Sequence, residues 1–300
     1  MKKIIAAVLT MLMVFCGCVP ALAGARPLLY RVEDEAGHRI YLLGTIHIGR
    51  ESMYPLSAAV EAAYDEAEIL AVELDVVAYR NNFLKSLLST AKLTYGLFDS
   101  ADRHLSPEVY AMGVEKLGLP EYTLRRLRPG AWLSLAENWM YEQTGLSAEL
   151  GVDMHLLGRA HADGKQIDEL EGYDSQMAVM LGLPDEIVDL QLQSTLKYPH
   201  VSGLSLKLML QAWENGDERT LTRYVQTDTS ALPGELREVY QEFLDMMYHD
   251  RDSGFEEQAR AYLKAGKTVL LAVGAAHIVG PGALADRLAQ AGYTVTEIGR

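Results

Sequence analysis

The segment VGAAHIVGPG, residues 273–282, places a histidine three positions after a glycine, directly behind the apolar run TVLLAV. The segment YLLGTIHIGR, residues 41–50, repeats this arrangement near the other end of the chain. An apolar run of this length, bounded by glycine, predicts a buried strand. The repetition of a strand that ends in Gly-x-x-His predicts two related units within one sheet.

Each Gly-x-x-His step lies inside the same predicted order of strand, histidine, helix and strand. The first unit is predicted to begin with a β-hairpin at residues 28–33 and 39–43. A helix at residues 56–67 follows, and then a buried strand at residues 68–75 that ends near Glu73. Residues 267–298 repeat the order at the C-terminal side. We therefore predict two βαβ-type units and a weak internal duplication, in a mixed or parallel sheet covered by helices.

The segment between the two units, residues about 79–265, shows mostly helical spacing of apolar residues. Three glycines each follow a predicted helix and precede a predicted strand, as left-handed glycines do at helix ends: Gly164, Gly266 and Gly292. The predicted class is α/β (α+β), with a sheet core formed by the two units and a large helical insertion between them.

The first 23 residues are predicted to be a cleaved secretory signal peptide. They combine an apolar stretch, too short to span a bilayer, with the A-x-A step of residues 21–23. The alternatives are a retained membrane anchor and a lipid anchor on Cys18. We expect a single mature domain, residues 24–300, that is periplasmic or secreted and has no stable membrane span.

Composition excludes several classes of function. The chain has 27 basic and 41 acidic residues, and cleavage would remove two lysines, leaving 25 − 41 = −16. Such an acidic protein repels phosphate backbones, so nucleic acid is not an expected partner. Both cysteines, Cys16 and Cys18, lie in the leader, so disulfides, thiolate metal sites and a cysteine nucleophile are not expected in the mature chain.

The two histidines and one glutamate are predicted to meet. His47, His277 and Glu73 each follow the end of a predicted strand, and parallel strands expose their carboxyl ends at one edge of a sheet. Two imidazoles and a carboxylate are ligands for a borderline divalent ion, and the glycines allow close approach of the backbone. The alternatives are histidines that only shape the sheet edge and a glycine-rich phosphate turn in VGAAHIVGPGALA, although G-x-G-x-x-G is incomplete there.

Four segments together resemble the TraB/GumN family, which includes the Tiki metalloproteases: LLGTIHIG, AVELD, GVDMHLLGRAHADGKQIDELEGYDSQM and VLLAVGAAHIVGPGALADRLAQAGYTV. The resemblance covers residues about 28 to 298. Members are described as metal-dependent. Tiki proteins cleave peptide bonds near the N-terminus of a secreted signalling protein, and TraB proteins act against peptide pheromones.

The resemblance implies roles for particular residues. The positions it assigns are His47 and His277 in the Gly-x-x-His motifs, Glu73 as the acidic member, Glu171 and Gln176 in the LE…Q segment, Asp153 in the G-x-D step, and Arg251. One position departs from the family pattern, because Asp252 occupies the place of an asparagine. If that asparagine binds substrate or metal, an aspartate would add a ligand charge or weaken recognition of a carboxylate.

These observations lead to an expected function, a metal-dependent hydrolase of peptides or small molecules that uses Mn, Co or Zn. His47, His277 and Glu73 would bind the ion, with Glu73 as ligand or base. Arg251 would stabilise an oxyanion or hold a substrate carboxylate, or only form a surface or interhelical ion pair in HDRD. Glu171 would act in catalysis, and both it and Asp153 would add ligands or support, or only cap helices and face solvent.

Two other classes of function are compatible with the same residues. A non-enzymatic protein could sequester a peptide or another ligand in the same cleft. An esterase or a haem binder is the other possibility, because erythromycin-esterase-like and ChaN-like proteins share a distant form of the His/Glu arrangement.

Overall fold

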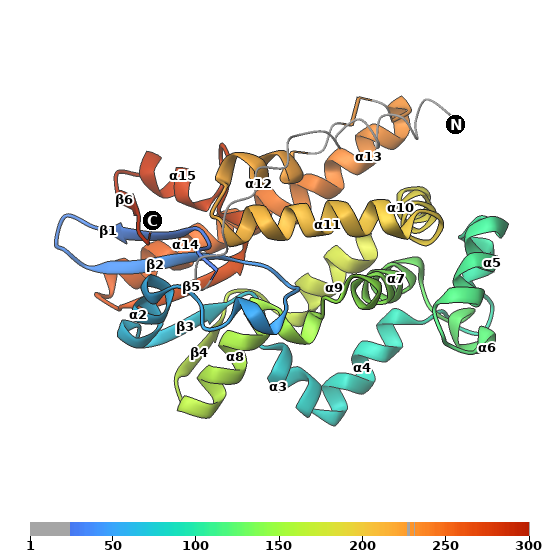
Figure 1. Ribbon diagram of the computed structural model, residues 1–300, viewed down its shortest axis with the longest axis horizontal. Coiled ribbons are helices and arrows are strands. Elements are labelled where there is room, and N and C mark those ends of the chain that lie inside the picture. The colour runs from blue at the N-terminus through green and yellow to red at the C-terminus, as the bar shows by residue number, and fades with distance from the viewer. Residues whose placement is uncertain (1–24, 227–228, 231, 300) are drawn as a thin grey trace.

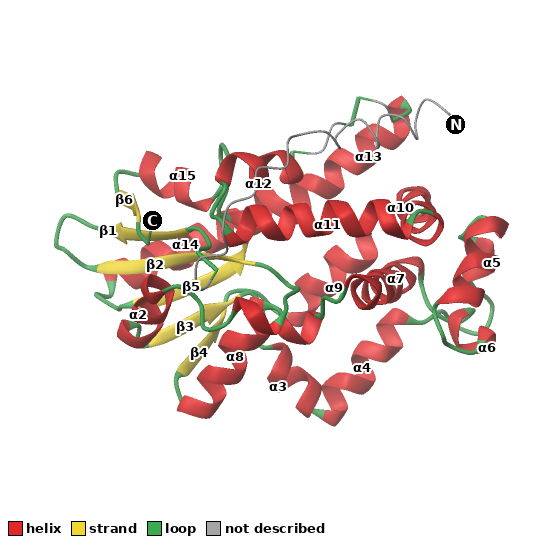
Figure 2. Cartoon of the chain, in the orientation of Figure 1, coloured by secondary structure: helices red, strands yellow, loops and turns green. Residues whose placement is uncertain are grey.

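The chain folds around one six-stranded mixed sheet with the strand order β4-β3-β5-β2-β1-β6 (Figures 1 and 2). The structure is a computed structural model, and it describes residues 25–226, 229–230 and 232–299. The expected signal peptide, residues 1–23, lies outside these residues. The strands are β1 (Leu29–Glu33), β2 (Arg39–Thr45), β3 (Ile69–Val72), β4 (Gln166–Glu169), β5 (Val269–Gly274) and β6 (Thr294–Glu297).

The first predicted unit is present. Strands β1 and β2 form the expected antiparallel hairpin, and helix α2 (Ala58–Glu66) follows, its N-terminus capped by the hydroxyl of Ser57, which accepts from the Val60 amide. Strands β2 and β3 both run parallel to β5, which lies between them. The unit β2-α2-β3 is thus a parallel crossover that leaves room for one strand of the second unit.

The second unit has the predicted order of elements but a different pairing. After β5 the chain passes through a 3₁₀ turn at Ala275–His277 and helix α15 (Leu284–Gln290) into β6. Strand β6 runs in the direction of β5, but it pairs antiparallel with β1 at the sheet edge. Neither histidine begins a long helix, because α2 and α15 start several residues after the Gly-x-x-His steps.

Helices cover both faces of the sheet. Right-handed crossovers place α2 and α8 (Val152–Asp163) on one face, where Arg159 of α8 bonds Glu61 of α2 at 2.5 Å. The step from β5 to β6 crosses the sheet in the opposite direction, so α15 lies on the other face beside α14 (Arg251–Lys264), joined by Arg287 and Glu256 at 3.0 Å. Between these layers the inner strands β2, β3 and β5 are almost completely buried, whereas the edge strands β4 and β6 are half-buried or exposed.

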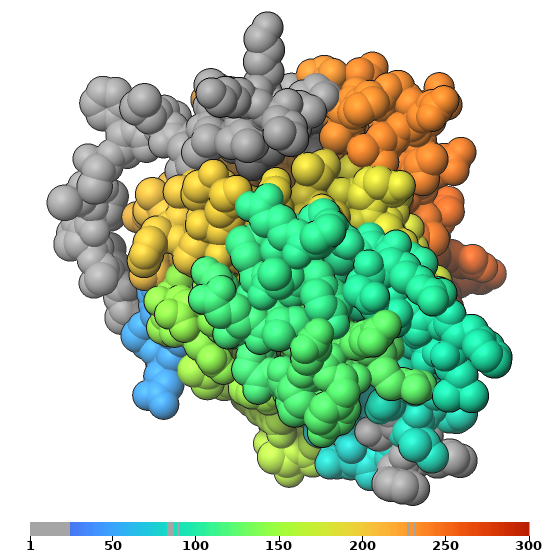
Figure 3. Space-filling view, turned by 90° about the vertical axis from the view of Figure 1, so that its right-hand side faces the viewer, coloured from blue at the N-terminus to red at the C-terminus, as the bar shows by residue number. Residues whose placement is uncertain are grey.

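A large helical region lies between β3 and β5, interrupted by edge strand β4, as Figure 2 shows. Its helices are α3 (Val76–Asn81), α4 (Phe83–Leu93), α5 (Pro107–Lys116), α6 (Glu121–Leu124), α7 (Pro129–Thr144), α8, α9 (Tyr173–Gly182), α10 (Asp185–Lys197), α11 (Pro199–Glu214), α12 (Glu218–Val225), α13 (Gly234–Leu244), a π-helix (Asp245–Asp250) and α14. Part of it has a core of its own, in which Trp132 of α7 and Leu192 of α10 are fully buried. Figure 3 views the molecule from this end, where the cyan-to-green segment forms most of the surface.

The backbone bears on two further expectations, the glycines at helix ends and the membrane span. Gly164, Gly266 and Gly292 all have positive φ, with values of 67°, 65° and 94°, as predicted for helix ends that lead into strands. Within the described part of the chain, no helix combines the length and apolar character needed to cross a bilayer.

Candidate active site

The ends of three neighbouring parallel strands bring together the residues predicted from the two motifs. Glu73 directly follows β3, His47 comes two residues after the end of β2, and His277 comes three residues after the end of β5. Strand β5 lies between the other two, and Thr45 is in register with Gly274. The three side chains therefore leave one edge of the sheet side by side, as the sequence predicted.

Gly274 is the point around which these side chains converge. A Cβ atom at this position would lie 3.3 Å from Oε1 of Glu73, 3.8 Å from Nε2 of His47 and 3.8 Å from Cδ2 of His277. The backbone of Gly274 has a negative φ of −48°, so close approach, and not a left-handed turn, is what requires glycine here. Gly44 is similar, because its Cβ would lie 3.1 Å from the backbone of the neighbouring segment.

Each histidine is held by an aspartate through the same ring nitrogen. Nδ1 of His47 lies 2.7 Å from Oδ2 of Asp153, and Nδ1 of His277 lies 2.6 Å from Oδ1 of Asp252. Asp153 is itself fixed by the hydroxyl of Thr45, which donates to its Oδ1 at 2.5 Å. A ring that donates from Nδ1 presents Nε2 for a ligand or a proton, an arrangement typical of metal-binding histidines.

The position where the family pattern has asparagine therefore has a defined place in the structure. Asp252 is the second residue of α14, is 4% exposed, and accepts from His277. An asparagine could accept through its side-chain oxygen in the same way. The aspartate differs by adding a negative charge behind the imidazole.

The two histidines differ in environment. The side chain of His277 is 4% exposed, whereas that of His47 is 70% exposed. The edge of the Phe255 ring faces His277, with ring centroids 5.2 Å apart. The negative charge of Asp153 raises the pKa of His47 well above its ordinary value, and the charge of Glu73 adds to this effect. A cation that binds His47 must therefore displace a proton from it.

Glu73 is a strongly ionised carboxylate. Burial by itself raises the pKa of Glu73, but the charges of His277, His47 and Arg251 outweigh it and hold the pKa at about 2. Its Oε1 accepts from the backbone amide of Gly274 at 2.7 Å. A carboxylate with so low a pKa is a weak base, so the environment favours an electrostatic or ligand role for Glu73 over proton abstraction.

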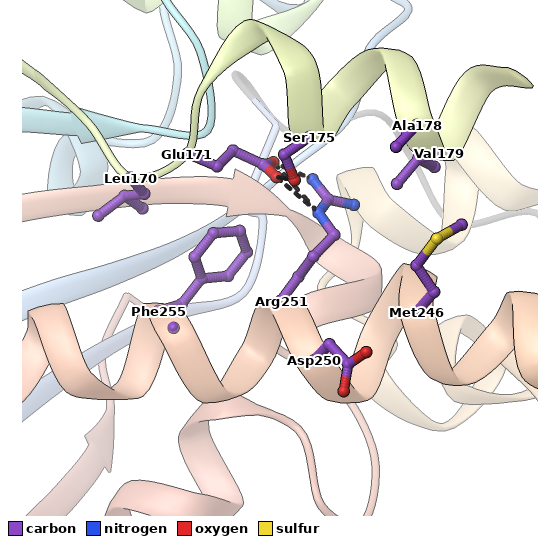
Figure 4. A pocket seen from close by; sticks show the side chains of 10 residues that line it. Leu170, Glu171, Ser175, Ala178, Val179, Met246, Asp250, Arg251 and Phe255 are labelled. Atoms are coloured by element: carbon purple, nitrogen blue, oxygen red, sulfur yellow. Dashed lines mark hydrogen bonds and ion pairs between the residues drawn. The ribbon is translucent and has the colours of Figure 1, made fainter. Parts of the chain in front are cut away.

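Arg251 joins Glu73 to Glu171, and Figure 4 shows its contact with Glu171. Its Nη2 lies 2.6 Å from Oε2 of Glu73 and also bonds Oε1 of Glu171, to which Nε donates at 3.1 Å. The arginine side chain is 9% exposed and that of Glu171 is 8% exposed. Both groups are buried, so a surface ion pair of Arg251 and a solvent-facing Glu171 are not what the structure shows. The other alternative, an ion pair of Arg251 between elements, is present.

Gln176, five residues after Glu171, completes this network. Its amide donates to Oε2 of Glu73 at 3.1 Å and to Oε1 of Glu171 at 2.8 Å. The hydroxyl of Ser175 donates to the other oxygen of Glu171 at 2.8 Å. The start of α9 thus holds both carboxylates in place, and the LE…Q segment is a structural unit of the site.

Two residues near the site carried no signal in the sequence. Glu137 of α7 lies within the electrostatic range of His47; burial raises the pKa of its carboxyl to about 7, although the charge of His47 acts in the opposite direction. Tyr248 lies on the π-helix before Arg251, with its ring centroid 5.7 Å from that of His277. No motif surrounds Glu137, and a π-helix, which is often found at functional sites, cannot be read from helical spacing.

The residues fit a divalent ion in part. The two Nε2 atoms supply oriented donors of the type that Mn, Co and Zn accept. Over the described ranges, however, no three His, Cys, Asp or Glu side chains are grouped closely enough to hold an ion as they stand. Oε1 of Glu73 and Nε2 of His47 both lie within 4 Å of the position that a Cβ atom of Gly274 would take, so Oε1 is the candidate third donor.

Sequence comparisons relate the chain to known proteins. The sequence profile of the TraB/PrgY/gumN family matches residues 28–297. The chain is 28% identical over 248 residues to the uncharacterized protein YbaP of Escherichia coli K12, covering 83% of this chain and 87% of that protein. The same values hold for the uncharacterized YbaP of Shigella flexneri. No solved structure matches the chain.

Proposed function

The chain belongs to the TraB/PrgY/gumN family, and from this premise we propose that it is a metal-dependent hydrolase of peptides that acts outside the cytoplasm. The extracytoplasmic location rests on the signal-peptide pattern of residues 1–23. The peptide substrate rests on the resemblance to Tiki and TraB proteins. The chemistry rests on the site itself.

The observation that carries the proposal is the pair of matched histidine–aspartate contacts. Asp153 and Asp252 come from helices on opposite faces of the sheet, yet each fixes Nδ1 of one histidine at 2.6–2.7 Å. Carboxylates in this position orient metal-binding imidazoles and increase their basicity. A sheet edge that needs only packing would not require two such contacts.

In this proposal His47 and His277 bind a Mn, Co or Zn ion, and Oε1 of Glu73 is the third protein donor. A bound divalent ion would lower the pKa of a water molecule and polarise the carbonyl of the bond to be cleaved. In the metal-free site the charges of His277, His47 and Arg251 keep Glu73 ionised, so its carboxylate is available as a donor when the ion binds.

Arg251 and Glu171 orient Glu73 in this proposal. Arginine has five N–H donors, and the bonds to Glu73, Glu171 and the carbonyl of Met247 occupy four of them. The remaining N–H belongs to Nη1, which makes the 3.3 Å bond to Met247. It is the donor that could bind a carbonyl or carboxylate oxygen of the substrate.

A metal titration followed by a cleavage assay tests the proposal. Metal-free full-length protein is titrated with Mn²⁺, Co²⁺ and Zn²⁺ beside the His47→Ala/His277→Ala variant and a His200→Ala control on α11. We expect wild type and control to bind tightly and the double variant to lose the site. Metal-loaded wild type should then cleave members of a peptide library. Equal binding by the double variant, or no cleavage in the whole library, would refute it.

A peptide-sequestering protein is the second candidate, and one finding favours it. Both oxygens of Glu73 already accept protein hydrogen bonds, and a third metal donor is not grouped with the histidines in the residues that the structure describes. Stoichiometric peptide binding without turnover, with or without added metal, would support this candidate.

A further inference from the structure

A cavity of about 280 Å³ lies between α9 and the π-helix that leads into α14 (Figure 4). Ala178 and Val179 of α9 form one wall, and Met246 and Phe255 form the opposite wall. Pockets that bury a whole small molecule usually measure about 300–1,000 Å³. This cavity is at the lower limit of that range, and one apolar side chain fits within it.

Two polar side chains of the cavity wall, Ser175 and Glu171, already have partners. The hydroxyl of Ser175 donates to Glu171 at 2.8 Å, and both carboxylate oxygens of Glu171 accept from Nε of Arg251 at 3.1 Å. Asp250, at the rim, is exposed to solvent. An apolar occupant would bury its surface here, whereas a charged occupant would find few groups to replace its hydration, namely the remaining Nη1 N–H of Arg251 and the solvated carboxylate of Asp250.

The cavity is one side chain away from the candidate catalytic residues. Arg251 lines the cavity and bonds Oε2 of Glu73 at 2.6 Å. Phe255 lines it too and contacts the ring of His277. In Figure 4 the guanidinium of Arg251 points between Glu171 and the α9 wall, toward the cavity. An occupant would therefore lie beside Arg251, which orients Glu73, and beside Phe255, which packs against His277.

We propose that this cavity is the specificity subsite of the protein and binds one apolar side chain, of the size of leucine or methionine, from a peptide substrate. The inference rests on the proposed function, because it assigns the substrate class of the same site. Met246 adapts readily to different apolar shapes, so the subsite accepts several such side chains. One methylene more or less in an apolar pocket typically changes the preference between two substrates by about 10- to 200-fold.

Direct binding tests the subsite without requiring turnover. The probes are blocked pentapeptides, glycine at every position except the central one, which is Leu, Met, Asp, Lys or Gly. Calorimetry measures their affinity for the full chain, with and without Mn²⁺. Val179→Trp fills the cavity, Ala178→Phe narrows it, and Val239→Trp is the matched control on exposed α13. Circular dichroism confirms that each variant is folded.

We expect wild type and Val239→Trp to bind the Leu and Met peptides at least about tenfold more tightly than the others, and Val179→Trp and Ala178→Phe to lose this preference. An unchanged preference in both cavity variants, or no preference in wild type, overturns the subsite. Cleavage with an unchanged preference leaves the hydrolase proposal standing and removes the subsite. Selective binding without cleavage supports the subsite and contradicts the hydrolase proposal.

Discussion

Nδ1 of His277 lies 2.6 Å from Oδ1 of Asp252, and both side chains are almost completely buried. The resemblance described above implies an asparagine at this position, and the aspartate offers the same kind of acceptor with an added charge. The first Gly-x-x-His step has the same geometry through Asp153, from another helix. The site is thus built from two imidazoles with equivalent supports.

Asp252→Ala should weaken metal binding by about 10- to 100-fold, the usual effect of losing a carboxylate behind a metal-binding imidazole. Asp252→Asn should cost less, because its side-chain oxygen still accepts from Nδ1. Titration of the metal-free variants with Mn²⁺ measures both effects. Wild-type affinity in Asp252→Ala would show that this contact only fixes the fold.

Arg251→Ala should destabilise the protein by about 3–5 kcal/mol, because it leaves the buried carboxylates of Glu73 and Glu171 without their counter-charge. Urea unfolding measures the change. Adding Glu171→Gln should restore part of the lost stability, since it removes one of the two charges. If the double variant is no more stable than Arg251→Ala, the loss comes from packing and not from unpaired charge.

Glu137 should make the metal-free protein less stable at alkaline pH. The pKa of its carboxyl is about 7 in the folded chain against an ordinary value of 4.5. Below pH 4.5 the group is protonated in both states, and its effect on stability is nil. Between pH 4.5 and pH 7 the unfolded chain loses this proton before the folded chain does. The free energy of unfolding therefore falls as pH rises, by at most about 3 kcal/mol once the pH is above 7.

Glu137→Gln should remove this fall. Urea unfolding of wild type and variant at pH 5 and pH 8 checks the prediction, and the variant should gain most at pH 8. An equal difference at both values would mean that Glu137 is already ionised at pH 5.

Mn²⁺ should bind more tightly as pH rises, because the ion must displace a proton from His47, whose pKa Asp153 raises. The gain should approach about tenfold per pH unit below that pKa. Affinities at pH 6.5, 7.5 and 8.5 measure it. Asp153→Asn should flatten the dependence, since it removes the main cause of the raised pKa, and a parallel curve in that variant would contradict the assignment.

The parts of the site that local sequence patterns could predict are those attached to strand ends. His47, His277 and Glu73 follow apolar runs whose parallel pairing fixes their common edge. Pairing between distant segments is not encoded locally, so the position of β6 beside β1 could not be predicted. The same reason hides Glu137, which reaches His47 only through the packing of α7.

Gly274→Ala should separate the fold from the site. The backbone angles of Gly274 are accessible to alanine, with φ −48° and ψ 137°, so the strand should form. Its methyl group would, however, lie 3.3 Å from Oε1 of Glu73 and 3.8 Å from Nε2 of His47, inside the space where we propose that an ion binds. We therefore expect thermal stability within a few degrees of wild type and a loss of Mn²⁺ affinity of at least about tenfold.

Gly158→Ala on α8, with open space around its Cβ, is the control and should bind Mn²⁺ normally. Normal binding by Gly274→Ala as well would place the metal away from the convergence of Glu73 and His47.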